Sequence, residues 1–332
     1  MTLTEANAGK AARQPAAHLT LVPHPKVCIG IPTYKRPGSL RLLLRSLERQ
    51  QTRAGITVIV ADNDSAGREG IAVCREIEAE GYRFPLLALA SPERGISPTR
   101  NVLAGAALDL ADTDCIAMID DDSWPDPNWI EVLLNMLENL NVDVVRGAMR
   151  PDFERLPEPW LVRTGLFQSS FTATGRVEQV HAAGNFLARA TVFRNVERPW
   201  FDPQYALTGG EDDDFFLRLR ERGYLFAHTV DTIVHERMPV SRSTAKWLLE
   251  RAQMNGASWA RVRMRRRPSG WTPQLEMTKL AAGFVFGLVT VCGCFWSRSL
   301  RFRGLYKMYR SIGKVRGLRG KQRLHYSTTH GT

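Results

Sequence analysis

Three consecutive carboxylates, Asp120, Asp121 and Asp122, are the residues of this chain best suited to chemistry. They directly follow the apolar run 115–119, which is short enough for a buried strand. In an open parallel sheet, ligands bind beyond the carboxyl ends of the strands. Adjacent carboxylates repel one another unless a cation joins them, and oxygen ligands suit Mg²⁺ or Mn²⁺ shared with a diphosphate. The alternative on these residues alone is a solvated acidic turn that stabilises the next helix.

A second acidic centre, the run of four acids from Glu211 to Asp214, follows two glycines. Glycines permit close backbone approach. Phe215, Phe216 and Leu219 then give the segment the apolar face of a helix. Acids in a first helical turn stabilise the helix dipole, which accounts for one or two of them. The excess predicts a carboxylate that takes part in chemistry.

Alternating strand and helix patterns must position these acids. Apolar runs typical of buried strands lie over 26–31, 56–61, 84–89 and 115–119. Helical periodicity lies over 40–47, 71–80 and 99–110, and again from Trp129. Four strand–helix repeats in the first 150 residues predict an α/β fold with a parallel sheet and crossover helices.

Each predicted strand ends in residues that a nucleotide could use. Thr33 and Tyr34 follow the first strand, Asp62 the second, and Arg94 and Arg100 the third. Asp62 could accept a hydrogen bond from a base or a ribose hydroxyl, and Arg100 could neutralise a phosphate. The sequence has neither GxGxxG nor GxxxxGK[ST], so neither a dinucleotide fold nor a P-loop is indicated.

The composition, 44% hydrophobic and 24% charged over 332 residues, allows a sizeable core. The net charge of +11 is concentrated in 298–323, which has ten Lys or Arg and no acid, and in the arginine cluster 261–267. Such segments bind phosphate on nucleic acid or on anionic lipid. The five cysteines form no CxxC pair and indicate a reduced, cytosolic compartment. The first 25 residues lack an apolar run long enough for a secretory signal and are expected to form a loose tail.

An uncharged segment of seventeen residues, 280–296, adjoins the basic region. As a helix it would be about 25 Å long, slightly less than the hydrocarbon core of a bilayer. Positive charge flanks it on both sides, so both ends are expected in the cytoplasm. A re-entrant or in-plane membrane helix meets that condition, and a hydrophobic dock for another protein is the alternative. The apolar neighbour favours lipid over nucleic acid as the partner of the basic segment.

Four motifs in order resemble family 2 glycosyltransferases of the GT-A fold. The segment 27–50 contains the Pro-Thr-Tyr-Lys-Arg-Pro start and a Leu-x-x-x-Leu-x-Ser-Leu-x-x-Gln helix. Val-Ala-Asp-Asn-Asp-Ser at 60–65, Arg100-Asn101 and Ile-Asp-Asp-Asp at 119–122 follow. The resemblance spans 26–256 and is strongest to bacterial glucosyltransferases that build succinoglycan-type exopolysaccharide. His181–Arg189 resembles the family's Gly-Asn strand beneath the donor sugar.

The resemblance implies a role for each matching residue. The nucleotide of a UDP-sugar would be bound by Pro32, Thr33, Tyr34, Arg36, Asp62, Arg100, Asp120 and Asp121. Asp120 and Asp122 would hold Mg²⁺ or Mn²⁺, together with His235, which matches the family's late histidine. Because the family's triplet varies in the middle, which two aspartates bind the metal stays open.

The family's Glu-Asp pair corresponds to Glu211 and Asp212, which implies that Asp212 is the general base. Like charge on Asp213 and Asp214 is expected to raise the pKa of Asp212, as a base working near neutrality requires.

The resemblance also implies the organisation of the chain. A catalytic domain over 26–240 would have a nucleotide-binding half, 26–150, and an acceptor half, 151–240, built on an open, mostly parallel sheet flanked by helices. A helical extension over 241–332 would associate with the membrane.

The expected activity is inverting transfer of a hexose, glucose in the first instance, from a UDP-sugar to a lipid-linked oligosaccharide in polysaccharide biosynthesis. The expected location is the cytoplasmic face of the inner membrane, where an anionic surface and other polysaccharide-assembly proteins are the candidate partners. A membrane-associated sugar-nucleotide-binding protein without turnover is the alternative.

Overall fold

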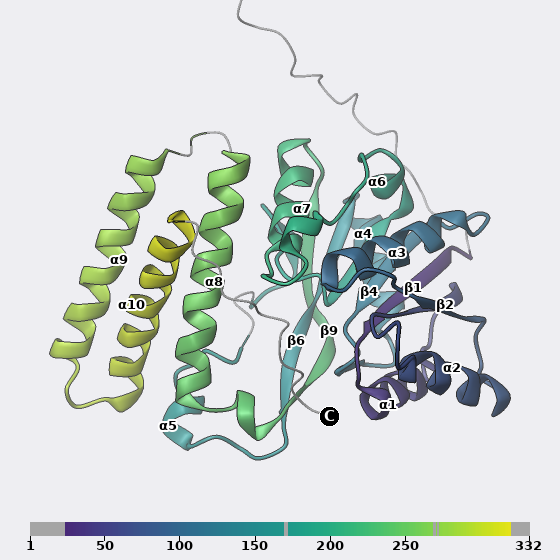
Figure 1. Cartoon of the computed structure of the whole chain (residues 1–332), viewed down its shortest axis with the longest axis horizontal. Helices are drawn as coiled ribbons and strands as arrows, with labels where there is room; N and C mark the ends of the chain where they lie inside the picture. Colours follow the sequence, from purple (N-terminus) through teal and green to yellow (C-terminus); the bar gives the residue numbers. More distant parts are fainter. Residues whose placement is uncertain (1–23, 169–171, 268–269, 271, 320–332) are drawn as a thin grey trace, which may run out of the picture.

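The computed structural model describes residues 24–168, 172–267, 270 and 272–319, and in this part of the chain an open nine-stranded sheet is flanked by helices (Figure 1). The strands are β1 (Lys26–Thr33), β2 (Gly55–Asp62), β3 (Leu86–Ala90), β4 (Cys115–Ile119), β5 (Ser123–Pro125), β6 (Val144–Phe153), β7 (Gly175–Val177), β8 (Asn185–Arg189) and β9 (Phe226–Met238). The helices are α1 (Pro37–Leu47), α2 (Glu69–Ala79), α3 (Ile96–Asp109), α4 (Trp129–Asn139), α5 (Pro159–Val162), α6 (Ala190–Arg194), α7 (Glu211–Glu221), α8 (Ala245–Arg266), α9 (Pro273–Gly293) and α10 (Arg298–Leu318), with short 3-10 turns η1 (Pro203–Tyr205) and η2 (Val240–Arg242).

The first half of the sheet is parallel, as predicted. β1 pairs in parallel with β2 and β4, and β2 pairs in parallel with β3. Helices α1, α2 and α3 connect successive strands. The carboxyl ends of β1, β2 and β4 therefore meet at one edge of the sheet, where the expected nucleotide and metal residues follow them.

The second half of the sheet mixes directions. β8 lies antiparallel between β4 and β6, while β6 runs parallel to β9. β6 continues to Phe153, with a shift of register between Gly147 and Ala148. The predicted boundary between the two halves of the catalytic domain, at residue 150, therefore falls inside a strand.

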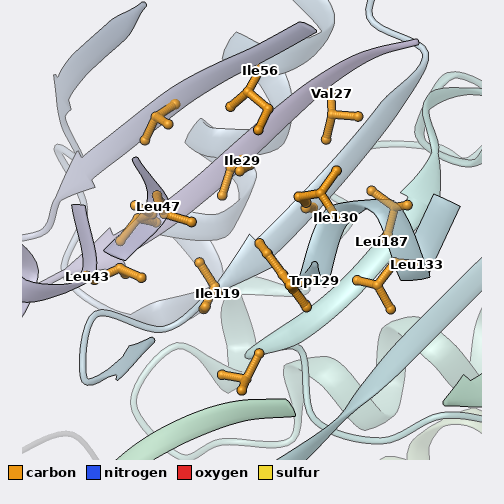
Figure 2. Packing of buried hydrophobic residues seen from close by; sticks show 14 of the residues in the cluster. Val27, Ile29, Leu43, Leu47, Ile56, Ile119, Trp129, Ile130, Leu133 and Leu187 are labelled. Carbon is orange, nitrogen blue, oxygen red and sulfur yellow. The ribbon is translucent and has the colours of Figure 1, made fainter. Parts of the chain in front are cut away.

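Alternate side chains of β1 divide the core into two layers. Val27, Ile29 and Ile31 pack with α1, α2 and α4 on one face, as Figure 2 shows for part of this cluster. Cys28 points to the other face, where α3, α6 and α7 supply the apolar partners. This period of two follows from the pleat of a strand. It explains why a run that is apolar at nearly every position is buried on both sides.

The three C-terminal helices stand side by side at one end of the sheet, with α10 between α8 and α9 (Figure 1). Glycines allow the close packing. A Cβ built on Gly313 of α10 would lie 2.0 Å from the carbonyl oxygen of Gln253 on α8. Between α9 and α10, a Cβ on Gly287 would lie 2.7 Å from the carbonyl oxygen of Gly304. The basic segment that begins at Arg298 is thus a helix packed into the molecule as far as residue 318.

The apolar segment predicted over 280–296 falls mainly in α9. In the described part of the chain, α9 is the one helix long and apolar enough to cross a membrane by length and composition, with a mean hydropathy of 1.6 over its most apolar window. Its outer side chains are exposed, among them Val285, Phe286 and Val289. The expected tail up to residue 23 and the basic residues after 319 lie outside the described residues.

Candidate active site

An open cavity of about 820 Å³ lies at the edge of the sheet where the predicted site residues were expected. Its lining includes eight of those residues, namely Pro32, Thr33, Tyr34, Arg36, Arg100, Asp120, Asp121 and Asp122. They come from the ends of β1 and β4 and from α3. These residues predicted from the ends of the strands therefore line one shared cavity.

The aspartate triplet is divided by its contacts. The hydroxyl of Thr33 donates to Oδ2 of the buried Asp121 at 2.8 Å, and Nη1 of Arg36 donates to its Oδ1 at 3.0 Å. Burial raises the pKa of Asp121 to about 7, against the opposing charge of Arg36. The middle aspartate thus ties the segment after β1 to the end of β4. Asp122 accepts from Arg36 and Arg242, and the side chain of Asp120 is 38% exposed.

Close approach of the backbone makes room for Asp120. A Cβ on Gly184 would lie 2.2 Å from Oδ2 of Asp120. The next residue, Asn185, is buried and accepts a hydrogen bond from Nε1 of Trp129 at 2.8 Å, while its amide donates to the carbonyl of Ala148 at 3.0 Å. The Gly-Asn pair therefore starts a regular strand, β8, and fixes the floor beside the first aspartate.

Arg100 connects the two acidic centres. Its buried guanidinium donates from Nη2 to Oδ1 of Asp120 at 3.1 Å and from Nη1 to Oε1 of Glu211. Glu211 begins α7 and lies 111 positions away in the sequence. The sequence predicted that Arg100 neutralises a phosphate. Its contacts with both carboxylates place that charge at the junction of the two centres.

The four acids at the start of α7 have different surroundings. Asp214 is fully buried and accepts from Arg218 at 3.0 Å and from Nε of Arg266 at 2.5 Å, so it joins α7 to α8. Asp213 pairs with His181 at 2.7 Å. Burial raises the pKa of Asp212 first, and the charge of Asp213 raises it further. The expected upward shift and the contribution of Asp213 are confirmed, but burial is the leading cause, and the charge of Asp214 is taken up by Arg218 and Arg266.

In the described part of the chain, the carboxylate of Glu211 is paired through one oxygen only. Burial first, and the charge of Asp212 second, raise its pKa to about 8, although Arg100 acts in the opposite direction. Its Oε2 is buried without a hydrogen-bond partner among the described residues. None of these four acids is among the described residues that line the cavity, and Arg100 connects them to its wall.

Besides Glu211 and Asp212, two further predicted site residues lie away from the described cavity lining. The buried carboxylate of Asp62 accepts from the backbone N–H groups of Gly70 at 2.8 Å and Ile71 at 3.2 Å, which caps α2. The ring of His235 stacks on Trp124, and its Nε2 lies 3.1 Å from Oδ1 of Asp126. Their predicted contacts with the nucleotide and the metal stay predictions.

The cavity also includes residues that the sequence did not single out. Glu236, at the end of β9, has its pKa raised to about 7, chiefly by burial and then by the charge of Asp122. Its position at a strand end was a usable signal. Arg242, Trp247 and Tyr306 also line the cavity. They come from the segments expected to form the C-terminal extension, and the local pattern there gave no sign of a shared cavity.

Comparison with known proteins agrees with this arrangement. The family model for glycosyl transferase family 2 matches residues 28–197, about half of the chain. The chain is 29% identical over 300 residues to the succinoglycan biosynthesis protein ExoM of Rhizobium meliloti (strain 1021), covering 88% of this chain and 92% of that protein. It is 26% identical to the hyaluronan synthase of Pasteurella multocida, covering 65% of this chain and 25% of that protein.

A solved structure shows the same fold. The mannosyltransferase PcManGT from Pyrobaculum calidifontis, in complex with GDP-Man and Mn²⁺, superposes with a TM-score of 0.58 and 17% identity, covering 91% of this chain and 90% of that one. The mixed α/β sheet and this likeness confirm the GT-A fold that the motifs predicted. The chain belongs to glycosyl transferase family 2 and has a homologue in exopolysaccharide synthesis.

Proposed function

We propose that the protein transfers a hexose, glucose in the first instance, from a UDP-sugar to a lipid-linked oligosaccharide in exopolysaccharide or other cell-surface polysaccharide biosynthesis. The observation that supports this most is the bridge made by Arg100 between Asp120 and Glu211. It joins the carboxylates suited to a sugar nucleotide to the acids suited to proton transfer. The family and the succinoglycan relative support the reaction class and the pathway type.

The end of the cavity beyond β1 and β2 suits a nucleoside diphosphate. The cations of Arg94 and Lys35 lie 5.3 Å and 5.5 Å from the centre of the Tyr34 ring. Arg36 lines the cavity beside this ring. A flat aromatic ring can stack on a base, and arginines bind phosphate oxygens in fixed geometry.

A divalent metal fits the carboxylates of this cavity. Within the described residues no three His, Cys, Asp or Glu side chains converge as a ready-made metal site. Asp120 and Asp122 line the cavity, however, and offer oxygen atoms only, which is the donor set that Mg²⁺ and Mn²⁺ prefer when phosphates supply further ligands. We propose these two aspartates as the metal ligands. When bound, the metal would stabilise the negative charge on the departing diphosphate.

The acids of α7 are proposed to take up the proton that the acceptor hydroxyl loses. Because the pKa values of Glu211 and Asp212 are both raised, these two adjacent carboxyl groups retain a proton to higher pH than ordinary carboxyl groups. Asp212 would accept the proton of the acceptor hydroxyl, whose oxygen bonds to the anomeric carbon as the bond to the diphosphate breaks. The electron pair of that bond leaves with UDP, and attack from the opposite side inverts the anomeric centre.

The C-terminal helices are proposed to bind the cytoplasmic face of the membrane without crossing it. α9 presents exposed apolar side chains, and α10 beside it is rich in Arg and Lys. α9 packs along α10, which packs along α8 of the cavity wall. Lying flat or dipping into the bilayer preserves these contacts, and a UDP-sugar donor requires a cytoplasmic catalytic domain.

We expect Asp212→Asn to lower transfer turnover by about 10²-fold or more, because the amide cannot accept the proton. UDP affinity, measured by calorimetry, should be preserved because the side chain keeps its shape. Asp213→Asn is the matched control, since Asp213 pairs with His181, and its loss of turnover should be much smaller. Full activity in Asp212→Asn would refute the assignment, and wild-type UDP binding without any transfer would favour the protein without turnover.

Chelation of divalent metal should abolish transfer, and Asp122→Asn should remove the metal-dependent part of UDP affinity, because the carboxylate that shares the ion with the diphosphate is lost. UDP titrations with and without Mn²⁺ measure this difference. Asp112→Asn is the control, since the exposed Asp112 pairs with Lys26 away from the cavity lining. If His235→Gln behaves like Asp122→Asn, the histidine is a ligand. Equal UDP affinity with and without Mn²⁺ in the wild type argues against the metal.

The raised pKa of Glu211 predicts how stability depends on pH. Between the usual value of 4.5 and about 8, the native carboxyl binds more protons than the unfolded one. Its contribution to the free energy of unfolding is therefore complete below pH 4.5 and lost as the pH rises to about 8. Urea denaturation at pH 5 and pH 8 should show a smaller loss for Glu211→Gln than for wild type. Glu178→Gln, on an exposed side chain, should keep the wild-type slope. An equal change in the free energy of unfolding between pH 5 and pH 8 in all three proteins would contradict a protonated, buried Glu211.

The double variant Val285→Ser, Val289→Ser should bind anionic lipid vesicles less tightly, because apolar contact with the acyl chains is lost. The two valines are 56% and 63% exposed. High salt should release the wild type only partly, since it screens the basic helix but not the apolar contact. Vesicle co-sedimentation measures both effects. Leu42→Ser on α1, a residue 55% exposed, is the control. Unchanged sedimentation of the double variant would exclude α9 as the contact.

A further inference from the structure

One half of the cavity is built by elements outside the region that matches the family model. The match ends at residue 197, whereas the first half of α8 and the middle of α10 supply one wall of the cavity. This wall includes Lys246, Trp247, Arg251 and Tyr306. Like the nucleotide end, it combines aromatic rings with cations, and it also carries the carboxylate of Glu250, but all of these come from the C-terminal helices.

The aromatic part of the wall rests on a separate apolar cluster. Leu161 of α5, Leu248 of α8 and Phe302 of α10 are its buried members, and Trp247 packs against it. The rings of Trp160 and Phe302 meet edge to face with centres 5.4 Å apart. Because three elements support it, the half-buried indole of Trp247 has a fixed position at the cavity.

The same wall of the cavity carries positive charge. Lys246 is exposed at the cavity, and the charge of Arg251 acts on the carboxylate of Glu236. A flat ring with neighbouring cations is suited to a sugar, whose C–H face packs on the ring, when that sugar is attached to a phosphate.

The turn between α9 and α10 carries a further pair of aromatic side chains. There Phe295 and Trp296 are 76% and 70% exposed. At the start of α10, the hydroxyl of Ser299 donates to the carbonyl of Trp160 at 2.6 Å, and Arg298 pairs with Glu158 at 3.0 Å. The exposed aromatic turn is therefore joined to the wall of the cavity through α5. Aromatic side chains of this kind favour the interface between a membrane and water.

We propose that the half-cavity lined by Lys246, Trp247, Arg251 and Tyr306 is the acceptor subsite, and that it takes a saccharide joined to a lipid through phosphate. Trp247 stacks on the sugar, Lys246 faces the phosphate, and Tyr306 closes the subsite from α10. This inference rests on the proposed transferase function and names the residues of the C-terminal helices that recognise its acceptor.

Binding to the full chain tests the subsite independently of turnover. Two probes are titrated in the presence of UDP: octyl β-glucoside below its micellar concentration, and glucose joined to the same octyl chain through a diphosphate. Trp247→Ala should weaken both by about tenfold, the order of loss expected when a stacked ring is removed, and Trp247→Phe should restore most of it. Lys246→Gln should weaken only the diphosphate-linked probe, with an effect that decreases at high salt.

Trp259→Ala is the matched control on the same helix, because the Trp259 ring contacts Arg263 and Lys314. It should leave both probe affinities unchanged, and UDP affinity should stay at the wild-type value in all these variants. Unchanged probe affinity in Trp247→Ala, or an equal loss in Trp259→Ala, overturns the subsite. Loss of UDP affinity in Trp247→Ala overturns it as well, since the wall would then serve the donor. Probe binding that depends on Trp247 in a wild type that transfers no sugar would retain the subsite and reject the transferase function.

Discussion

The buried guanidinium of Arg100 is the constraint on which the site depends. It lies between carboxylates supplied by the end of β4 and by α7, so its charge is paired with both elements. Removing one partner of a buried ion pair leaves an uncompensated charge, which is strongly destabilising. Helix α3, the end of β4 and the start of α7 are thereby held in one arrangement, and Arg100, which lines the cavity, links the aspartates of its wall to the acids of α7.

The remaining acids are divided between structure and chemistry by their partners. Asp121 and Asp214 are buried, and hydrogen bonds from hydroxyl or guanidinium groups fix them. Asp120 is partly exposed at the cavity, and Glu211 retains an oxygen without a partner among the described residues. In each acidic run, at least one carboxylate is fully hydrogen-bonded and fixes the local structure, and another keeps an oxygen that can bind a ligand or a proton. This explains why both runs contain more acids than helix stabilisation needs.

Much of this could be predicted from the sequence, because the relevant signals are local. The apolar runs of β1, β2 and β4 and the polar residues directly after them lie within a few positions of each other. The contacts of Asp122 with Arg242 and of Arg100 with Glu211 span 120 and 111 positions, and no local pattern reveals them. Asp62 shows a further limit, since a carboxylate at a strand end can cap the next helix as readily as it can meet a ligand. The packing of α10 on α8 was not predicted, because the many basic residues of α10 indicated an exposed helix. The glycines that allow the close approach gave no separate signal in the sequence.

That glycine packing has a genetic consequence. A nonsense mutation shortly before α9 would leave the whole region matched by the family model intact. It would nevertheless remove Tyr306 and uncover the side of α8 on which α10 lies. Such an allele should therefore behave as a loss of function even where a foreign lipid anchor is fused to the shortened protein. Restoring the wild-type phenotype would require α9 and α10 themselves.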